Sequence, residues 1–257
     1  MLTKNQFKLY TSLKQLKYRY IHQLFIVEGL KSVEELLSSN FETTELIVTE
    51  NWLKSNTQIA SETQLMTEIV TDKEMALLSN LTTPPGVMAI AKMPDNQNVS
   101  PDLKNRITLV LDGISDPGNM GTIIRTADWF GFGNIICSED SVDVYNHKVV
   151  QASMGSIFRL NVISRDLTNV FTMAAESGVP VFGAYLDGEN IYESTSDFKE
   201  GILVIGSESH GIREKVHPFI TNKISIPNFS KGQNKAESLN ASIATAILLS
   251  EMKRKHR

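Results

Sequence analysis

The chain has 257 residues, 41% of them hydrophobic, which is enough for one large domain or two small ones. Its net charge of −4 excludes a protein that binds polyanions over its whole surface. No stretch approaches the roughly 18 consecutive apolar residues of a membrane span, and the first 15 residues lack the apolar run of a signal peptide. The single cysteine, Cys137, excludes an internal disulfide, so we expect a cytoplasmic protein.

The first 20 residues combine basic and aromatic side chains without an acidic one. Apolar side chains recur there at three-residue steps, which predicts an amphipathic helix over residues 3–17. This mixture suits phosphate contact and base stacking, and a solvated helix face is the alternative interpretation. The basic residues are Lys4, Lys8, Lys14, Lys17 and Arg19, and the tyrosines are Tyr10, Tyr18 and Tyr20.

Strands and helices alternate through the next 70 residues. Apolar runs predict strands at 24–29, 45–49 and 86–93, with helices at 30–39 and 71–80, the second one capped by Asp72. We therefore expect a small α/β domain over residues 1–93. Residues 94–106 hold two prolines and almost no apolar residue, which is typical of a linker.

The alternation resumes over residues 107–257 and predicts a second α/β domain. Near-continuous apolar runs favour a mainly parallel sheet that helices cover on both faces. Ligands of such sheets bind beyond the carboxyl ends of the strands, so the loops after residues 113, 186, 206 and 226 are the candidate site. The expected strands are 107–113, 134–138, 159–163, 179–186, 202–206 and 223–227, and the expected helices are 119–130, 146–154, 166–177, 211–220 and 238–254.

Three of these segments carry polar side chains. In the first, Asn119 is expected to cap a helix, and Arg125 follows six residues later. Six residues turn a helix by about 600°, so the two side chains do not share a face. A plain cap for Asn119, and an ion pair with Asp128 or a solvent-exposed position for Arg125, are the structural alternatives.

The second segment, LVIGSESHGIREKV, runs from a strand into a polar turn that holds Glu208 at the mouth of the sheet. Its alternative role is to favour the dipole of the following helix. The segment lacks GxxxxGK[ST], and no GxGxxG follows any predicted strand, which argues against nucleoside-triphosphate and dinucleotide folds.

The third segment runs from Pro227 to the C-terminal helix. Ser238 is expected to cap that helix, and Asn240 in its first turn suggests a specific hydrogen-bonding role, because asparagine disfavours helix interiors. The helix carries an apolar face and several alanines, as in a buried terminal helix or a dimer interface. The apolar residues are Leu239, Ile243, Ile247 and Leu248.

Together these segments closely resemble the motifs of the SpoU (TrmH-type) family of RNA ribose 2′-O-methyltransferases. The matching stretches are NMGTIIRTAD at 119–128, VQASMGS at 150–156, GSESHG at 206–211, and Ile226-Pro227 with SLNAS at 238–242. The stretches LFIVEGLKSVEELL and LTTPPGVMAIA resemble the accessory substrate-binding domain of the family, which is similar to certain RNA-binding ribosomal proteins. The resemblance spans nearly the whole chain.

The resemblance implies a C-terminal α/β domain tied in a deep trefoil knot, S-adenosylmethionine bound in the knot loops, and a homodimer formed through this domain. By position, backbone groups of Gly206, Ile226 and Leu239 contact the cofactor. One departure is Asn228, which follows Pro227 where the family has an apolar residue, together with an insert at residues 229–237. The family's polar active-site positions correspond to Asn119, Arg125, Glu208, Ser238 and Asn240.

The implied reaction is attack of a ribose 2′-hydroxyl on the sulfonium methyl. A guanidinium keeps its proton and offers no lone pair, so we expect Arg125 to grip the target phosphate and the 2′-oxygen rather than act as a base. Asn119 and Glu208 would orient it, and the basic N-terminal helix would bind RNA.

The resemblance favours ribosomal RNA as the substrate. The alternatives are transfer RNA, or a non-catalytic RNA-binding protein with a relic cofactor pocket. No metal is expected, because the five histidines lack the spacing of a ligand cluster.

Overall fold

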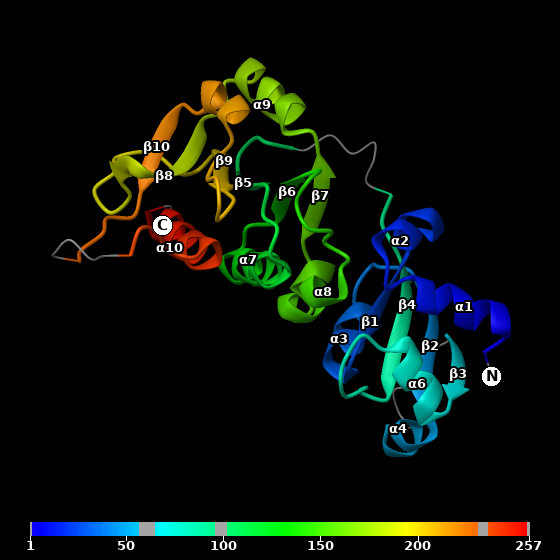
Figure 1. Ribbon diagram of the computed structural model, residues 1–257. Coiled ribbons are helices and arrows are strands. Elements are labelled where there is room, and N and C mark those ends of the chain that lie inside the picture. The colour runs from blue at the N-terminus through cyan, green and yellow to red at the C-terminus, as the bar shows by residue number, and fades with distance from the viewer. Residues whose placement is uncertain (1, 57–64, 96–101, 231–235, 256–257) are drawn as a thin grey trace. The chain divides into compact units, whose positions relative to one another are not determined.

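The computed structural model describes residues 2–56, 65–95, 102–230 and 236–255 (Figure 1). The chain divides into two compact units, one of Met1–Asp95 with Asp143–Phe158 and one of Asn96–Val142 with Arg159–Arg257. The proposed domain boundaries and the linker at 94–106 stay a prediction. They differ from this division at residues 143–158, which fold with the first unit, and residues 96–101 of the linker lie outside the described part.

The first unit is built on a four-stranded mixed sheet in the order β1-β4-β2-β3. Strand β4 runs antiparallel to β1 and β2, and β3 runs parallel to β2. The described elements are α1 (Lys4–Ser12), α2 (Leu16–His22), β1 (Leu24–Glu28), α3 (Leu30–Leu37), β2 (Thr43–Thr49), α4 (Glu50–Ser55), β3 (Met66–Val70), α6 (Asp72–Leu78), β4 (Val87–Lys92), α8 (His147–Ser153) and the 3-10 helix η1 (Ser156–Phe158).

The single helix expected over residues 3–17 is wrong, because the chain forms two helices there. The buried Arg19 explains the break. Its Nη1 donates to the carbonyls of Leu13 and Lys14, at 2.9 and 3.1 Å, and so takes up groups at the end of α1 that a continuous helix would have paired with backbone N–H groups. Arg19 is therefore a structural residue rather than part of an exposed basic face.

The cap expected at Asp72 is also wrong. Thr71 caps α6 in a reciprocal arrangement, in which its hydroxyl accepts from the Glu74 N–H and the Glu74 carboxylate accepts from the Thr71 N–H. Strand β3 and helix α4 did not emerge from the sequence pattern. Both elements are short, and β3 lacks a clear alternation of buried and exposed residues.

Residues 143–158 contribute apolar side chains to the first unit. Tyr145 packs on Phe25 with ring centroids 4.7 Å apart, and Phe158 meets Phe41 edge-on at 5.3 Å. Helix α8 packs against β1. These contacts explain why the segment groups with a unit that lies far from it in the sequence.

The second unit contains a six-stranded sheet in the order β10-β8-β9-β5-β6-β7, and every neighbouring pair is parallel. The predicted parallel sheet is confirmed. Its elements are β5 (Ile107–Asp112), α7 (Pro117–Phe130), β6 (Asn134–Ser138), β7 (Asn161–Arg165), α9 (Leu167–Glu176), β8 (Val181–Asn190), β9 (Gly201–Gly206), the 3-10 helix η2 (Glu214–Phe219), β10 (Asn222–Ser225) and α10 (Ala241–Lys255).

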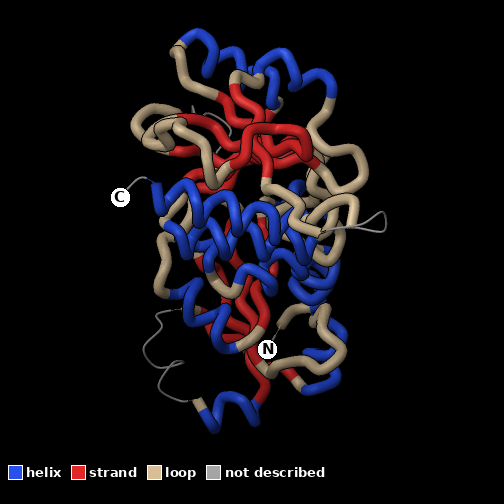
Figure 2. Tube along the Cα trace, turned by 90° about the vertical axis from the view of Figure 1, so that its left-hand side faces the viewer, coloured by secondary structure: helices blue, strands red, loops and turns tan. Residues whose placement is uncertain are grey.

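Helices cover both faces of this sheet, as Figures 1 and 2 show. Helices α7 and α10 pack together on one face, and α9 and η2 pack together on the other. Central strands such as β5 and β9 are buried on both sides, which is why they read as unbroken apolar runs. The helix expected at 211–220 is a short 3-10 helix containing Pro218.

Strand order does not by itself test the proposed knot, which stays a prediction. In the part of the chain that the structure describes, no helix has both the length and the apolar composition needed to cross a bilayer.

Candidate active site

The site is built at the carboxyl edge of the parallel sheet. Strands β5 and β9 are neighbours, and their last residues, Asp112 and Gly206, pair with each other. The loops that follow them therefore start side by side. The first leads into α7, and the second holds Glu208.

Asp116, and not Asn119, caps α7. The Asp116 carboxylate accepts from the Asn119 N–H at 2.7 Å, and Pro117 occupies the first helical turn. Asn119 lies in the first turn, so its side chain is not used for capping. The expected cap role of Asn119 is wrong, and its amide is available for contacts outside the helix.

The Asn119 side chain joins the three loops that the sequence singled out. Its Nδ2 donates to Glu208 Oε1 at 2.5 Å, and its Oδ1 accepts from Asn240 Nδ2 at 3.0 Å. These residues are 89 and 121 positions from Asn119 in the chain. Three separate segments thus meet at one amide group.

Asn240 also sets the start of the C-terminal helix. Its Oδ1 accepts from the Ser242 and Ile243 N–H groups, at 2.9 and 3.3 Å, and α10 begins at Ala241. The expected cap at Ser238 is therefore wrong. Asn240 was expected in the first turn, but it lies before the helix as its cap, and its Nδ2 donates to Asn119. Its role in the site stays a prediction.

The loop after β9 is tightly closed. Ser207 and Gly211 exchange two backbone hydrogen bonds of 3.0 and 2.9 Å. A Cβ atom on Gly206 would lie 2.1 Å from the Gly211 carbonyl carbon, so only glycine lets the chain turn back this closely. This turn projects Glu208, which is exposed, towards Asn119.

Arg125 is not part of this hydrogen-bonded group. It lies exposed on α7 and forms no hydrogen bond or ion pair with the residues that the structure describes. The ion pair considered with Asp128 is absent from the described contacts, since Arg159 donates to that carboxylate from two nitrogens, at 2.9 and 2.8 Å. The Arg125 guanidinium is therefore available to a ligand or to another chain.

The remaining predicted cofactor positions lie on the third loop. Ile226 is half-buried, and Ser238 and Leu239 are exposed just before α10. Asn228, where the sequence departs from the family pattern, spans the insert: its Nδ2 donates to the Ala236 carbonyl at 3.2 Å and its Oδ1 accepts from the Ser230 N–H at 2.9 Å. Residues 231–235 of the insert lie outside the described part.

Arg213, which the sequence motifs do not single out, links Asp112 and Asp140 at the carboxyl edge of the sheet. Arg213 binds the fully buried carboxylate of Asp112 through its backbone N–H at 2.8 Å and its Nε at 2.6 Å. Its Nη1 donates to Asp140 Oδ2 at 2.8 Å. Nearby carboxylates raise the pKa of Arg213 although burial opposes this. The available signal was an aspartate at the end of a buried strand, which needs a cationic partner.

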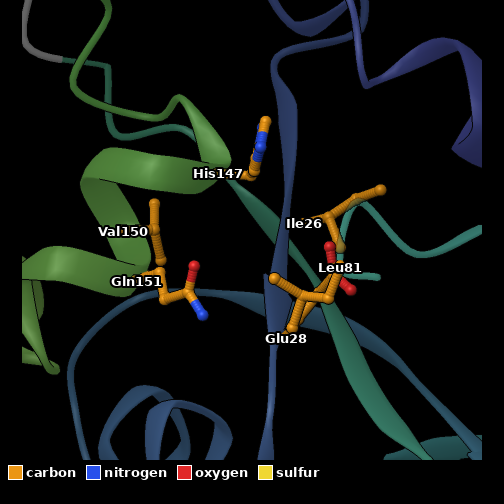
Figure 3. A pocket seen from close by; sticks show the side chains of 6 residues that line it. All are labelled: Ile26, Glu28, Leu81, His147, Val150 and Gln151. Carbon is orange, nitrogen blue, oxygen red and sulfur yellow. The ribbon is translucent and has the colours of Figure 1, made fainter. Parts of the chain in front are cut away.

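One pocket lies in the first unit and includes Val150 and Gln151 of the stretch at 150–156 (Figure 3). Its Glu28 carboxylate already accepts from the backbone and side-chain nitrogens of Asn80, both at 2.9 Å. Burial lowers the pKa of His147, so this ring is neutral at pH 7. The pocket is lined by Ile26, Glu28, Leu81, His147, Val150 and Gln151.

Comparison with known proteins agrees with this geometry. Residues 106–250 match the model of the SpoU rRNA Methylase family, and residues 4–89 match the MRM3-like substrate binding domain. The chain is 29% identical to the 23S rRNA (guanosine(2553)-2′-O)-methyltransferase RlmP of Bacillus subtilis, over 88% of this chain and 86% of that protein.

Two solved structures are similar over nearly the full length. One, assigned to the TrmH family of RNA methyltransferases, is from Porphyromonas gingivalis and shares 38% identity and a TM-score of 0.85, with 99% of each chain covered. The other is an AdoMet-bound rRNA methyltransferase from Sinorhizobium meliloti, with 27% identity and a TM-score of 0.82 over 99% of this chain and 96% of that one. The family match covers more than half of the chain and includes all three loops joined at Asn119, so this protein belongs to the SpoU rRNA methylase family.

Proposed function

We propose that this protein transfers the methyl group of S-adenosylmethionine to a ribose 2′-hydroxyl of ribosomal RNA. The observation that carries this proposal is the meeting of Glu208, Asn119 and Asn240 at the carboxyl edge of the sheet. Relatives named as rRNA methyltransferases support the substrate. Family membership supports the reaction.

The exposed chain at this edge fits a cofactor held partly through backbone groups. Residues 236–240 are exposed just before α10, so the backbone of Ser238 and Leu239 lies within reach of a ligand, whereas the Asn240 carbonyl already accepts from the Ala244 N–H at 2.9 Å. We assign cofactor binding to Gly206, Ile226 and Leu239, with Ser238 and Asn240 beside them. When bound, S-adenosylmethionine supplies an electrophilic methyl group on a cationic sulfonium.

Asn119 and Arg125 have different proposed roles. Asn119 holds Glu208 and Asn240 in one arrangement, which keeps the second and third loops together around the cofactor. Arg125 has no described partner, and its guanidinium can donate to a phosphate and to the 2′-oxygen at once. A cation beside that oxygen lowers the pKa of the hydroxyl and stabilises the negative charge that develops during attack.

We also propose that a second copy of the chain covers the face of α7 that carries Arg125. Trp129 lies one turn further along that face and is 84% exposed, and Ile243 on the adjacent α10 is 51% exposed. Large exposed apolar side chains on two neighbouring helices favour an interface there. This arrangement explains why Arg125 is not bonded within its own chain, since a homodimer would bring it towards the partner's site.

The test is methyl transfer from tritiated S-adenosylmethionine to ribosomal RNA, with the product mapped at nucleotide level. Arg125→Ala should lower the rate about 10²- to 10³-fold, the effect of removing one preorganised donor. Arg125→Lys keeps the charge but not the two-pronged geometry, so it should also be slow. The matched control is Arg106→Ala, since Arg106 is half-exposed at the start of β5, at the opposite edge of the sheet.

Three outcomes would contradict the proposal. Normal turnover of Arg125→Ala would show that Arg125 has no role in the reaction. Methylation of transfer RNA in preference to ribosomal RNA would change the substrate. Failure of calorimetry to detect S-adenosylmethionine binding would leave a non-catalytic RNA-binding protein.

We propose the cytoplasm as the place of this reaction. The single cysteine, Cys137, is a buried free thiol, and burial raises its pKa to about 12, so it remains reduced and unreactive there.

A further inference from the structure

Helix α2 exposes apolar and aromatic side chains that the first unit does not bury. Leu16, Tyr20 and Ile21 are 53%, 47% and 58% exposed. The rings of Tyr18 and His22, one turn apart, are nearly parallel, with an interplanar angle of 15° and centroids 6.3 Å apart. These five residues together with Lys17 are six of the seven residues of α2 and surround the helix, with Arg19 alone turned inward; we call them the α2 face. The Tyr20 hydroxyl donates to Asp143 Oδ1 at 3.5 Å, and its ring stays 47% exposed. Exposed apolar groups gathered on one element are typical of an interaction site.

The basic residues of the N-terminal region fall into two groups. Lys14 and Arg19 point inward, since Lys14 Nζ donates to the carbonyls of Leu77 and Ser79 at 2.9 and 2.7 Å, and Arg19 pairs with Asp143. The second group, Lys4, Lys8 and Lys17, is exposed. Lys17 Nζ lies 5.9 Å from the Tyr18 ring centroid, so cation and ring share one surface.

The segment that carries the α2 face has basic but no acidic residues. The first acidic residue of the chain is Glu28, after α2 has ended. The Asp143 carboxylate that reaches α2 is buried, with a side chain 5% exposed, and Arg19 neutralises it through Nε and Nη2 at 2.8 and 2.6 Å. Exposed rings on a positive surface are complementary to a nucleic acid whose bases are unpaired, because phosphates and base faces are recognised together.

We propose that the α2 face binds unpaired nucleotides of the RNA substrate by base stacking, while the exposed Lys4 and Lys8 on α1 contact phosphates of the same RNA. This proposal rests on the proposed function for the identity of the RNA. In a general basic patch, RNA affinity comes from charge alone, whereas here part of the affinity comes from bases that stack on aromatic rings. The proposal also excludes Lys14 and Arg19, which the sequence alone does not distinguish from the exposed residues.

The experiment measures binding of the full-length protein to a fluorescent unpaired 12-nucleotide RNA, and to a fully paired duplex of the same length, over a range of salt. Tyr20→Ala should weaken binding of the unpaired RNA roughly 5- to 150-fold, the range for loss of one stacked base. Its salt dependence should not change. Tyr20→Phe keeps the ring and should bind like the wild type.

Lys8→Gln, unlike Tyr20→Ala, should change the salt dependence of RNA binding. Loss of one phosphate contact should lower the slope of log K against log salt by about 0.7, with similar effects on any sequence. The matched control is Met66→Ala on β3, which removes a 61% exposed apolar side chain from the same unit and should have no effect.

Normal affinity of Tyr20→Ala, equal weakening by Met66→Ala, or tighter binding of the duplex than of the unpaired RNA would each overturn the inference. So would a wild type that self-associates through this surface, shown by a smaller particle mass for Ile21→Ser in light scattering. Methylation of ribosomal RNA by the wild type is measured separately. Loss of oligonucleotide binding in Tyr20→Ala would therefore support the α2 face even if that activity were absent.

Discussion

Gly206 is the position where one methyl group should have the largest local effect. Its Cβ would lie 2.1 Å from the Gly211 carbonyl carbon, so the loop carrying Glu208 must move in Gly206→Ala. We expect S-adenosylmethionine binding to weaken by about 10- to 100-fold, the scale of a misplacement near 1 Å. Calorimetry measures this, with Gly133→Ala as the control, since a Cβ there meets nothing within 4 Å. Equal affinities for the two variants would contradict the loop argument.

Arg213 should stabilise the fold by neutralising Asp112. That carboxylate is fully buried, so Arg213→Gln leaves it without a cation and should cost about 3 kcal/mol of unfolding free energy, at the low end for buried pairs because the Arg213 side chain is 28% exposed. Adding Asp112→Asn should recover much of the loss, since the unpaired charge disappears. Urea denaturation measures both. An Arg213→Gln protein as stable as the wild type would be inconsistent with this role.

Asp140 should contribute to acid stability. Burial raises its pKa, but hydrogen bonding involving Ser138 and the Asp140 backbone, together with the charge of Arg213, outweighs burial and leaves the pKa below 3.8. A lowered carboxyl pKa gives stability that is present above pH ~4 and is lost as the pH falls through the folded-state value. The melting temperature of Asp140→Asn should therefore fall less steeply than that of the wild type below pH ~4. The same pH dependence of the melting temperature in Asp140→Asn and in the wild type below pH ~4 would contradict this role of Asp140.

At the scale of elements, a buried ion pair adds to the aromatic contacts that hold the segment 143–158 on the first unit. Arg19 and Asp143 have side chains 5% exposed, and Asp143→Asn leaves the guanidinium without its charge partner. We expect a loss of about 3–5 kcal/mol and faster hydrogen exchange in α2 and β1. The matched control is Asp102→Asn, whose half-exposed pair with Arg106 should contribute at most about 1 kcal/mol. Equal effects of the two substitutions would argue against the burial of the pair as the cause.

Elements were predictable where local patterns decide them. Buried parallel strands such as β5 and β9 appear in the sequence as continuous apolar runs, and α7 and α10 were placed to within three residues. The caps were predicted less well. Ser238 and Asn240 are both good capping residues, and only the approach of the Asn119 side chain distinguishes them.

At the scale of the whole molecule, the proposed homodimer makes Trp129 the critical residue. Trp129 is 84% exposed in the single chain. A glutamate in its place would be buried in the interface without a partner for its charge, so Trp129→Glu should yield a monomer. Light scattering coupled to size exclusion measures the mass, and Leu77→Glu, at a 61% exposed apolar residue of α6, should leave it unchanged. A dimeric Trp129→Glu, or a monomeric wild type, would contradict the assignment.

The sequence by itself determined the second α/β domain, its parallel sheet and the three loops that hold Asn119, Glu208 and Asn240. Apolar periodicity and local residue preferences act over a few positions, so a single chain records them. It could not determine which polar side chains meet, because a hydrogen bond across 121 residues leaves no local pattern.

Only the tertiary structure decided the partners of the charged residues. It removed Arg19 and Lys14 from the exposed basic surface, joined Arg213 to Asp112, and left Arg125 outside the hydrogen-bonded group. It also grouped residues 143–158 with the first unit, since the rings that pack together there are distant in sequence. The physical reason is common to all of these: burial and pairing depend on what folding brings alongside a side chain, and neighbours along the chain do not specify it.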